Sequence, residues 1–173
     1  MNNPFLAQHI IDIPDFPKPG IIFKDISPLL ASQEARDQMT QALIEPFQDQ
    51  KIDVVVGIES RGFLFGMLMA KALNAKFVMI RKPGKLPGKI MSQEYQLEYG
   101  SDTIEMQEAA IKSTDSVLIH DDVLATGGTA AAAYSLINQT GASILGYSFI
   151  IELDFLKGRA LLSGHDLHAI LHY

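Results

Sequence analysis

Short apolar runs rich in β-branched residues, each bounded by polar or glycine residues, recur along the chain. Runs of this kind are typical of buried strands in a mostly parallel sheet. The segments between them have apolar residues at helical spacing and Asn74 or Gly141 just beyond their ends. The pattern predicts strands over 52–58, 76–80, 116–120, 144–151 and 167–173, and helices over 33–47, 61–73 and 129–139. Strand and helix alternate, so we expect an α/β fold with a mostly parallel, twisted central sheet flanked by helices.

Two segments do not follow this alternation. Residues 13–30 contain four prolines and one glycine, so we expect an irregular N-terminal hood with one short strand over 21–24. Residues 84–102 are polar, contain glycine and proline, and are long for a connection, which is typical of a lid. We therefore expect one domain over 1–173, with the hood at about 1–32, the core at about 33–173 and a flexible lid near 84–103. Pro46 should end the first long helix.

Composition narrows the possible functions. A chain of 173 residues with 47% hydrophobic and 20% charged residues suits one globular domain. The absence of cysteine excludes disulfides, thiolate metal ligands and a thiol nucleophile. The net charge of −6 argues against general binding to nucleic acid or anionic membranes. The N-terminal residues do not resemble a secretion signal and no long apolar run is present, so we expect a cytoplasmic protein.

A positive patch is nevertheless expected on this acidic chain. Residues 76–89 hold five of the fourteen Lys and Arg residues and no acid. Such a patch suits a small polyanion, although a solvated basic loop would have the same composition.

The stretch "SVLIHDDVLATGGTAAAAY" places two acids between a predicted strand and a glycine turn, which we define as residues 125–129. Gly127 and Gly128 permit a tight turn, and the helix start beyond them offers unsatisfied N–H groups to an anion. Asp121 and Asp122 would accept hydrogen bonds from neutral hydroxyls. A sugar 5-phosphate supplies both partners, whereas the Walker and dinucleotide motifs do not match. A strand end followed by an ordinary helix cap is the plain alternative.

The segment "VLIHDDVLATGGT" resembles the phosphoribosyl pyrophosphate (PRPP) motif of the type I phosphoribosyltransferase family, and "LATGGT" is the form seen in its adenine-specific members. The resemblance implies that Asp121 and Asp122 hold the ribose hydroxyls of PRPP. It also assigns a set of residues to the 5-phosphate. These residues are Ala125, Thr126, Gly127, Gly128 and Thr129.

Four further segments resemble the same family, in the same order, over roughly residues 14–159: "PDFPKPGIIFKDISPLL", "GIESRGFLFG", "IRKPGKLPG" and "YQLEYG". In the second, Glu59 and Ser60 match the pyrophosphate loop, with a cis peptide expected between them. Taken alone, each segment also fits an ordinary turn, solvated loop or core aromatic. The residues that the resemblance assigns to the leaving pyrophosphate are Arg61, Arg81 and Lys85, with Lys82 and Lys89 as further candidates.

The other two segments carry the implied base and acid–base residues. In "YQLEYG", Glu98 matches the carboxylate that manages a proton on the base, and Tyr99 a PRPP or AMP contact. In "IIFKD", Phe23 matches an aromatic residue that stacks on adenine. The backbone groups of Ile22 and Lys24 would then read the edge of the base.

The resemblance implies a pentosyltransferase of purine salvage that converts adenine and PRPP into AMP and pyrophosphate. It also implies Mg²⁺ held by PRPP, pyrophosphate and water with no dedicated protein ligand, and a homodimer. Two alternatives stay open: a noncatalytic PRPP-sensing regulator, and an enzyme that uses hypoxanthine, guanine or xanthine.

The histidines are harder to assign. His120 departs from the family pattern, in which an apolar residue precedes the acid pair. Strand alternation places its side chain on the same side as that of Asp122. The C-terminal histidines, His165, His168 and His172, could suggest a metal cluster. The terminal "LHAILHY" resembles a final strand, however, and no acid stands near these histidines at a spacing suited to a metal, so we do not predict a metal site there.

Overall fold

The computed structural model describes residues 3–96 and 100–173. Its centre is a sheet of five strands in the order β4-β3-β7-β8-β9, in which every neighbouring pair is parallel. The predicted α/β class and parallel sheet are confirmed. The bounds are β3 (Val54–Ile58), β4 (Lys76–Ile80), β7 (Ser116–Leu124), β8 (Ser143–Glu152) and β9 (Leu167–His172).

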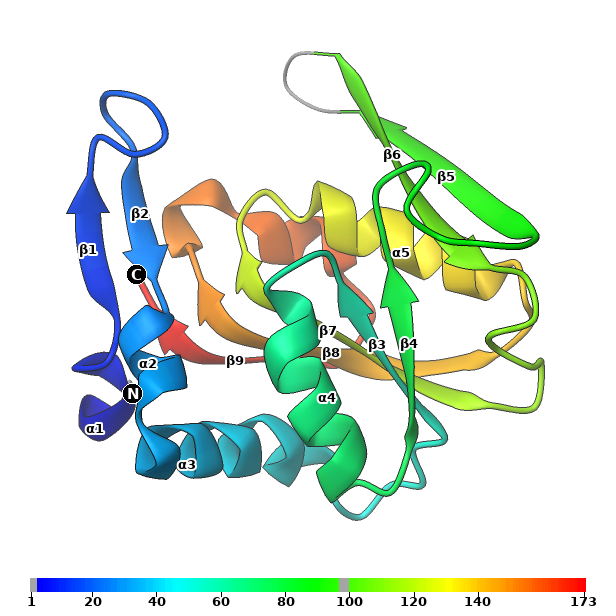
Figure 1. Ribbon diagram of the computed structural model, residues 1–173, viewed down its shortest axis with the longest axis horizontal. Helices are drawn as coiled ribbons and strands as arrows, with labels where there is room; N and C mark the ends of the chain where they lie inside the picture. The colour runs from blue at the N-terminus through cyan, green and yellow to red at the C-terminus, as the bar shows by residue number, and fades with distance from the viewer. Residues whose placement is uncertain (1–2, 97–99) are drawn as a thin grey trace.

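Helices cover both faces of this sheet, as Figure 1 shows. One apolar core joins α3 (Gln33–Ile44) and α4 (Gly62–Ala72) to the sheet, and a second joins α5 (Gly128–Asn138) to the other face. Adjacent side chains of β3 belong to different cores, Val55 to the first and Val54 and Val56 to the second, because strand side chains alternate between faces.

The chain reverses its direction across the sheet at β3. It passes from β3 to β4 on one side, then returns across β3 to β7, β8 and β9 on the other. The carboxyl ends of β3 and β7 therefore flank a topological switch point, which is where open α/β sheets form ligand crevices.

Helix ends follow the local chemistry of the sequence. The Ser32 side chain accepts a hydrogen bond from the Ala35 N–H and caps the start of α3. This helix ends at Ile44 and continues as a 3₁₀ turn, Glu45–Phe47, which contains Pro46. The predicted effect of Pro46 is confirmed.

The hood is more regular than its proline content predicts. β1 (Ile11–Pro14) pairs antiparallel with β2 (Ile22–Asp25), and short helices α1 (Pro4–Ala7) and α2 (Ser27–Ala31) flank them. The prediction of a single strand is therefore wrong. Pro14 is compatible with β1 because it lies at the end of an edge strand.

Residues 84–102 were predicted as one long connection, but the described part of this segment contains strands. β5 (Ile90–Gln96) and β6 (Ser101–Gln107) form an antiparallel ribbon, which we call the β5–β6 ribbon. In Figure 1 it stands at the upper right of the sheet, with the hood at the left. Ile104 and Met106 are buried in the core that contains α5, so the ribbon is anchored by its apolar face.

β7 runs to Leu124, beyond the predicted end at 120, so Asp121 and Asp122 lie inside the strand. Over residues 3–96 and 100–173, the helices are all too short or too polar to cross a lipid bilayer.

Candidate active site

The glycine turn links the end of β7 to the start of α5. Gly127 has φ of 85°, a left-handed conformation that favours glycine, and α5 begins at the next residue. The turn and Asp121 line a small cavity of about 70 Å³. Backbone N–H groups at a helix start and the hydroxyls of Thr126 and Thr129 are suitable donors to an anion.

A second glycine, Gly158, packs against the backbone of this turn. The 3₁₀ turns Asp154–Leu156 and Gly158–Leu162 follow β8. A Cβ added to Gly127 would lie 2.5 Å from the Gly158 carbonyl oxygen. One added to Gly158 would clash with the Ala125 carbonyl oxygen. The two glycines therefore allow a close backbone approach that fixes the turn against the end of β8.

The acid pair occupies a poorly solvated position. Asp122 is 5% exposed and forms an ion pair with Arg61, with 2.8 Å between Oδ2 and Nε. Asp121 accepts a hydrogen bond of 2.8 Å from the Asp122 N–H. Burial, followed by the negative charge of Asp122, raises the pKa of Asp121 well above its usual value. Burial also raises the pKa of Asp122, and the Arg61 charge opposes this rise.

Arg61 links the acid pair to the hood. Its guanidinium carbon lies 4.6 Å from the centre of the Phe23 ring, which is a cation–π distance. An Arg61 N–H also donates to the Lys24 carbonyl oxygen at 3.4 Å. The structure thus brings the predicted base-binding strand and Asp122 together through one side chain.

Glu59 organises the basic segment that follows β4. Its carboxylate lies 3.1 Å from Arg81 Nε and 2.5 Å from Lys85 Nζ, and it accepts a 2.8 Å hydrogen bond from the Lys82 N–H. Burial alone would raise the pKa of Glu59, but these hydrogen bonds and charges lower it below its usual value. The predicted cis peptide between Glu59 and Ser60 is confirmed.

Sequence reasoning missed one polar cluster at this edge. Arg81 and Lys85 pair with Glu59, whereas the ammonium group of Lys82 pairs with Asp102 of β6. The hydroxyl of Tyr95 lies 3.3 Å from Lys82 Nζ and 3.2 Å from Thr129 Oγ1. The cluster therefore connects the basic segment, the β5–β6 ribbon and the glycine turn.

Two predicted site residues, Glu98 and Tyr99, lie outside the described residues. The predicted base-binding residues lie within β2, and the acid pair lies near the carboxyl end of β7. The remaining predicted residues, Lys89 excepted, follow β3, β4 or β7, so those of the three sheet strands share the carboxyl edge of the parallel sheet. Lys89 stands just before β5, and its carbonyl oxygen accepts a hydrogen bond from the Glu108 N–H at the base of the ribbon.

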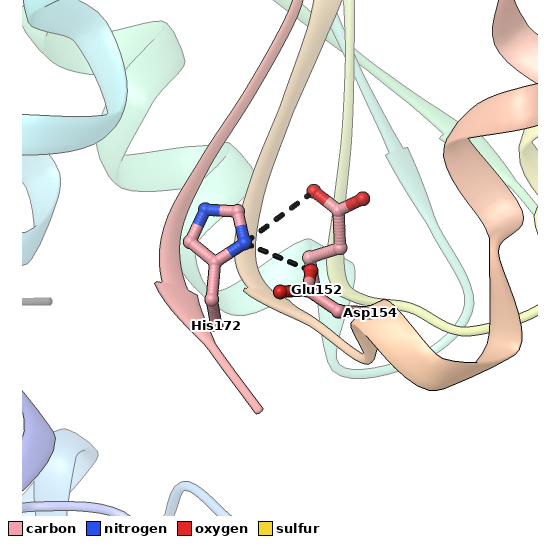
Figure 2. A group of neighbouring side chains, drawn as sticks. All are labelled: Glu152, Asp154 and His172. Carbon is pink, nitrogen blue, oxygen red and sulfur yellow. Dashed lines mark hydrogen bonds and ion pairs between the residues drawn. The ribbon is translucent and has the colours of Figure 1, made fainter. Parts of the chain in front are cut away.

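A histidine–carboxylate cluster lies beyond this site. Figure 2 shows the Nδ1 atom of His172 facing Asp154, at 3.0 Å, and Glu152, at 3.8 Å. The expectation that no acid accompanies the C-terminal histidines is therefore wrong for His172. Its partner acids come from β8 and the turn after it, so sequence spacing did not reveal them. Arg159 also binds both carboxylate oxygens of Glu152, so an internal cation already balances this charge.

His120 is fully buried beside the acid pair. Its Nδ1 atom lies 2.8 Å from the Ser148 carbonyl oxygen, so this nitrogen carries the proton and donates it. Burial lowers the pKa of His120 to about 4. The imidazole is consequently neutral at pH 7 and lies in the interior of the protein.

The chain is similar to known proteins of one family. A model of the phosphoribosyl transferase domain family matches residues 25–153. An adenine phosphoribosyltransferase from Flavobacterium johnsoniae is 52% identical over 168 residues, which cover 97% of this chain and 99% of that protein. The chain belongs to the adenine phosphoribosyltransferase family.

Solved structures of adenine phosphoribosyltransferases share the whole fold. The Rhodothermus marinus structure has a TM-score of 0.94 at 51% identity and covers 98% of this chain and 97% of its own. A Saccharomyces cerevisiae structure, in complex with an imino-altritol bisphosphate and adenine, has a TM-score of 0.91 at 44% identity. That match covers 96% of this chain and 97% of the yeast chain. The hood and the β5–β6 ribbon are thus within the span shared with other adenine phosphoribosyltransferases.

Proposed function

We propose that the protein transfers the 5-phosphoribosyl group of PRPP to N9 of adenine and so forms AMP and pyrophosphate in purine salvage. One observation carries the proposal. The glycine turn, the buried acid Asp122 and the cations held by Glu59 all lie at the switch point of one sheet. These groups match, in turn, the phosphate, the ribose hydroxyls and the pyrophosphate of PRPP.

At the leaving-group end, the protein supplies positive charge. Bond cleavage at the anomeric carbon leaves additional negative charge on pyrophosphate, and cations fixed nearby lower the barrier. Glu59 holds Arg81 and Lys85 before substrate arrives, so little reorganisation is needed. The backbone of the loop after β3, which contains Ser60, would supply N–H groups to the same leaving group.

At the ribose and the base, the protein binds the substrates and orients them. Asp122 would release Arg61 and accept hydrogen bonds from the ribose hydroxyls. Asp121, which lines the cavity at the glycine turn, would bind the ribose hydroxyls together with Asp122. Phe23 would stack on adenine while the backbone groups of Ile22 and Lys24 bind its edge. Such backbone recognition suits the single strand β2, which presents these three residues in succession.

Glu98 is proposed, from the resemblance of "YQLEYG", to hold the proton at N7 of adenine as N9 attacks. Tyr99 is proposed to contact PRPP beside it. Glu98→Ala should lower turnover by on the order of a hundredfold and leave the Kd of PRPP nearly unchanged, because only the proton transfer is lost. Rapid-quench turnover and calorimetric binding measure the two quantities, and a variant with normal turnover would remove Glu98 from this role.

We expect Mg²⁺ to bind at this site through the substrate and not through carboxylates of the protein. Glu59 and Asp122 already face internal cations, so these acids do not form an open cage for a metal. Pyrophosphate and ribose oxygens with water would therefore hold it, and the ion would neutralise charge on the leaving group. A dependence of AMP formation on added Mg²⁺ is the direct check.

We also propose a homodimer and a cytoplasmic location. Met67 of α4 is 52% exposed and Met79 of the edge strand β4 is 40% exposed, and these two elements pack together. A second copy that covers this apolar surface would explain the exposure. Light scattering on the purified protein tests the dimer. PRPP is too highly charged to cross a bilayer, so its use favours the cytoplasm, which cell fractionation would check.

The central experiment measures pyrophosphate release from PRPP with Mg²⁺ and one base at a time. Adenine should support release, whereas hypoxanthine, guanine and a reaction without base should give a small fraction of that rate. Release with guanine or hypoxanthine instead would favour the related-base alternative. PRPP binding without any turnover would favour the regulator.

A further inference from the structure

Tyr95 joins the β5–β6 ribbon to the glycine turn, and the proposed reaction has not used it. Its hydroxyl lies 3.2 Å from Thr129 Oγ1 and donates to Asp102 Oδ2 at 3.3 Å. Lys82 Nζ donates to the same hydroxyl at 3.3 Å and pairs with Asp102. One phenolic proton therefore has two acceptors within reach, the Asp102 carboxylate and the Thr129 hydroxyl.

The Tyr95 ring is fixed against the first turn of α5. A Cβ added at Gly128 would lie 3.6 Å from the ring, which is ordinary van der Waals contact. The ring also packs against the buried core beneath the ribbon. Because a tyrosine side chain has only two main torsions, this packing holds the hydroxyl at the edge of the turn.

An anion in the turn should decide between the two acceptors. Thr129 has one hydroxyl proton, which it would donate to a bound phosphate. The lone pairs of Thr129 would then accept the Tyr95 proton, while Tyr95 accepts from the Lys82 ammonium. The three donors, Lys82, Tyr95 and Thr129, would form a chain directed at the phosphate, in which each hydrogen bond polarises the next.

We propose that Tyr95 is a positioning residue that relays 5-phosphate binding from Thr129 to the β5–β6 ribbon. The relay rests on the proposed function, because that function identifies the anion in the turn as the 5-phosphate. It assigns Lys82 to the 5-phosphate end of PRPP, whereas Arg81 and Lys85 serve the pyrophosphate end. It also gives the ribbon a direct contact with the substrate-binding turn.

The test measures ribose 5-phosphate binding by calorimetry, since this probe fills the turn without any reaction. Tyr95→Phe keeps the ring and removes only the hydroxyl. It should weaken binding about fivefold, the effect of one hydrogen bond of ordinary strength. Tyr134→Phe is the matched control, because the Tyr134 ring packs on His165 away from the turn. The control should bind like the wild type, and thermal melting should show that both variants fold.

Two further readouts separate a relay from simple packing. Tyr95→Phe should raise the KM of PRPP by the same factor and leave the KM of adenine unchanged. Thr129→Val, alone and combined with Tyr95→Phe, completes a double-mutant cycle in which the combined loss is smaller than the product of the single losses.

The outcomes distinguish failure of the relay from failure of the proposed function. Unchanged ribose 5-phosphate binding in Tyr95→Phe, or losses that multiply independently in the cycle, would overturn the relay. Wild-type protein that binds ribose 5-phosphate but makes no AMP would contradict the proposed function, and the binding cycle would still decide the relay. Wild-type protein that does not bind ribose 5-phosphate would contradict both.

Discussion

His120 places a titratable group within the core, one residue before the acid pair. Burial lowers its pKa from the ordinary 6.5 to about 4, so the folded protein resists protonation that the unfolded chain accepts. The free energy of unfolding should therefore fall as pH drops from 6.5 to 4, by on the order of 3 kcal/mol from this group. Urea unfolding at several pH values measures the effect.

The acid pair changes stability in the opposite direction, so a comparison is needed to isolate His120. The raised pKa of Asp121 means that the folded state binds a proton more readily than the unfolded chain, which stabilises the fold as pH falls. His120→Val retains Asp121 and removes only the imidazole titration. The difference between the wild-type and variant curves should show the His120 loss, and parallel curves would contradict it.

Arg61 covers groups that substrates are proposed to use. Its guanidinium faces the Phe23 ring and pairs with Asp122, so it must move before adenine can stack on that face of Phe23. Arg61→Ala should tighten adenine binding to the free protein about fivefold, as about 1 kcal/mol of competing contact is lost. It should also lower turnover. Calorimetry with adenine alone measures the first effect.

Arg36→Ala is a suitable control for that measurement. Arg36 donates to the Leu30 carbonyl oxygen, outside the candidate site. It should leave adenine binding unchanged. Weaker adenine binding in Arg61→Ala would mean that Arg61 helps to hold the base and does not cover its platform.

Among individual residues, the sequence predicted those that act within one short segment. The glycine turn is contiguous from 125 to 129, so its residue types alone indicated an anion site. Tyr95 and Thr129 stand 34 residues apart and meet only when the ribbon packs on α5. Glu59 was assigned to PRPP, but its contacts with Arg81 and Lys85 needed the fold to appear.

At the scale of elements, the 3₁₀ segment after β8 supports the glycine turn. Gly158→Ala would push a methyl group against the Ala125 carbonyl oxygen and the Gly127 nitrogen, both in the turn backbone. The turn should shift, and the Kd of ribose 5-phosphate should rise about tenfold, with a stability loss of about 1–3 kcal/mol. Calorimetry and thermal unfolding measure the two effects.

Gly164→Ala provides the comparison. Gly164 has φ of 91° but open space around a Cβ, so alanine there costs backbone strain without touching the turn. It should lower stability and leave phosphate binding intact. Equal loss of phosphate binding in both variants would show that the Gly158 effect is only general destabilisation.

Elements buried on both faces were predicted well, because a continuous apolar run needs little context. The β5–β6 ribbon was missed although Asp102, Ile104 and Met106 alternate at a period of two. Most of its other residues are polar, so the length and glycine content of the segment suggested a loop. β1 was missed because Pro14 argues against a strand unless that strand is known to be an edge.

For the whole molecule, ligand binding should stabilise the fold, because the proposed contacts join the hood, the sheet edge and the ribbon. AMP at a concentration of 100 times its Kd should add about 2.7 kcal/mol to the free energy of unfolding. For a chain of this size the melting temperature should rise by about 5–10 °C. Calorimetric melting with AMP measures this, and GMP at the same concentration is the control. Equal shifts with both nucleotides would contradict selectivity for adenine.

The overall architecture was accessible from sequence because parallel strands place their carboxyl ends at one edge. Three of the strands were predicted from sequence, and their carboxyl ends bring Glu59, Arg81 and Asp122 to that edge. The rule could not place the hood or the ribbon, which lie outside the five-stranded sheet. It also could not bring Glu152 and His172 together, since strand neighbours late in the chain are not set by spacing.

The position of Arg61 has a practical consequence for inhibitor design. In the free protein, its cation provides both the counter-charge for Asp122 and the cover for Phe23. A flat aromatic compound alone would have to displace that cation and leave a buried carboxylate without a partner. A compound that joins an aromatic ring to a protonated amine would replace both contacts, so medicinal chemistry against this pocket should begin from cationic scaffolds.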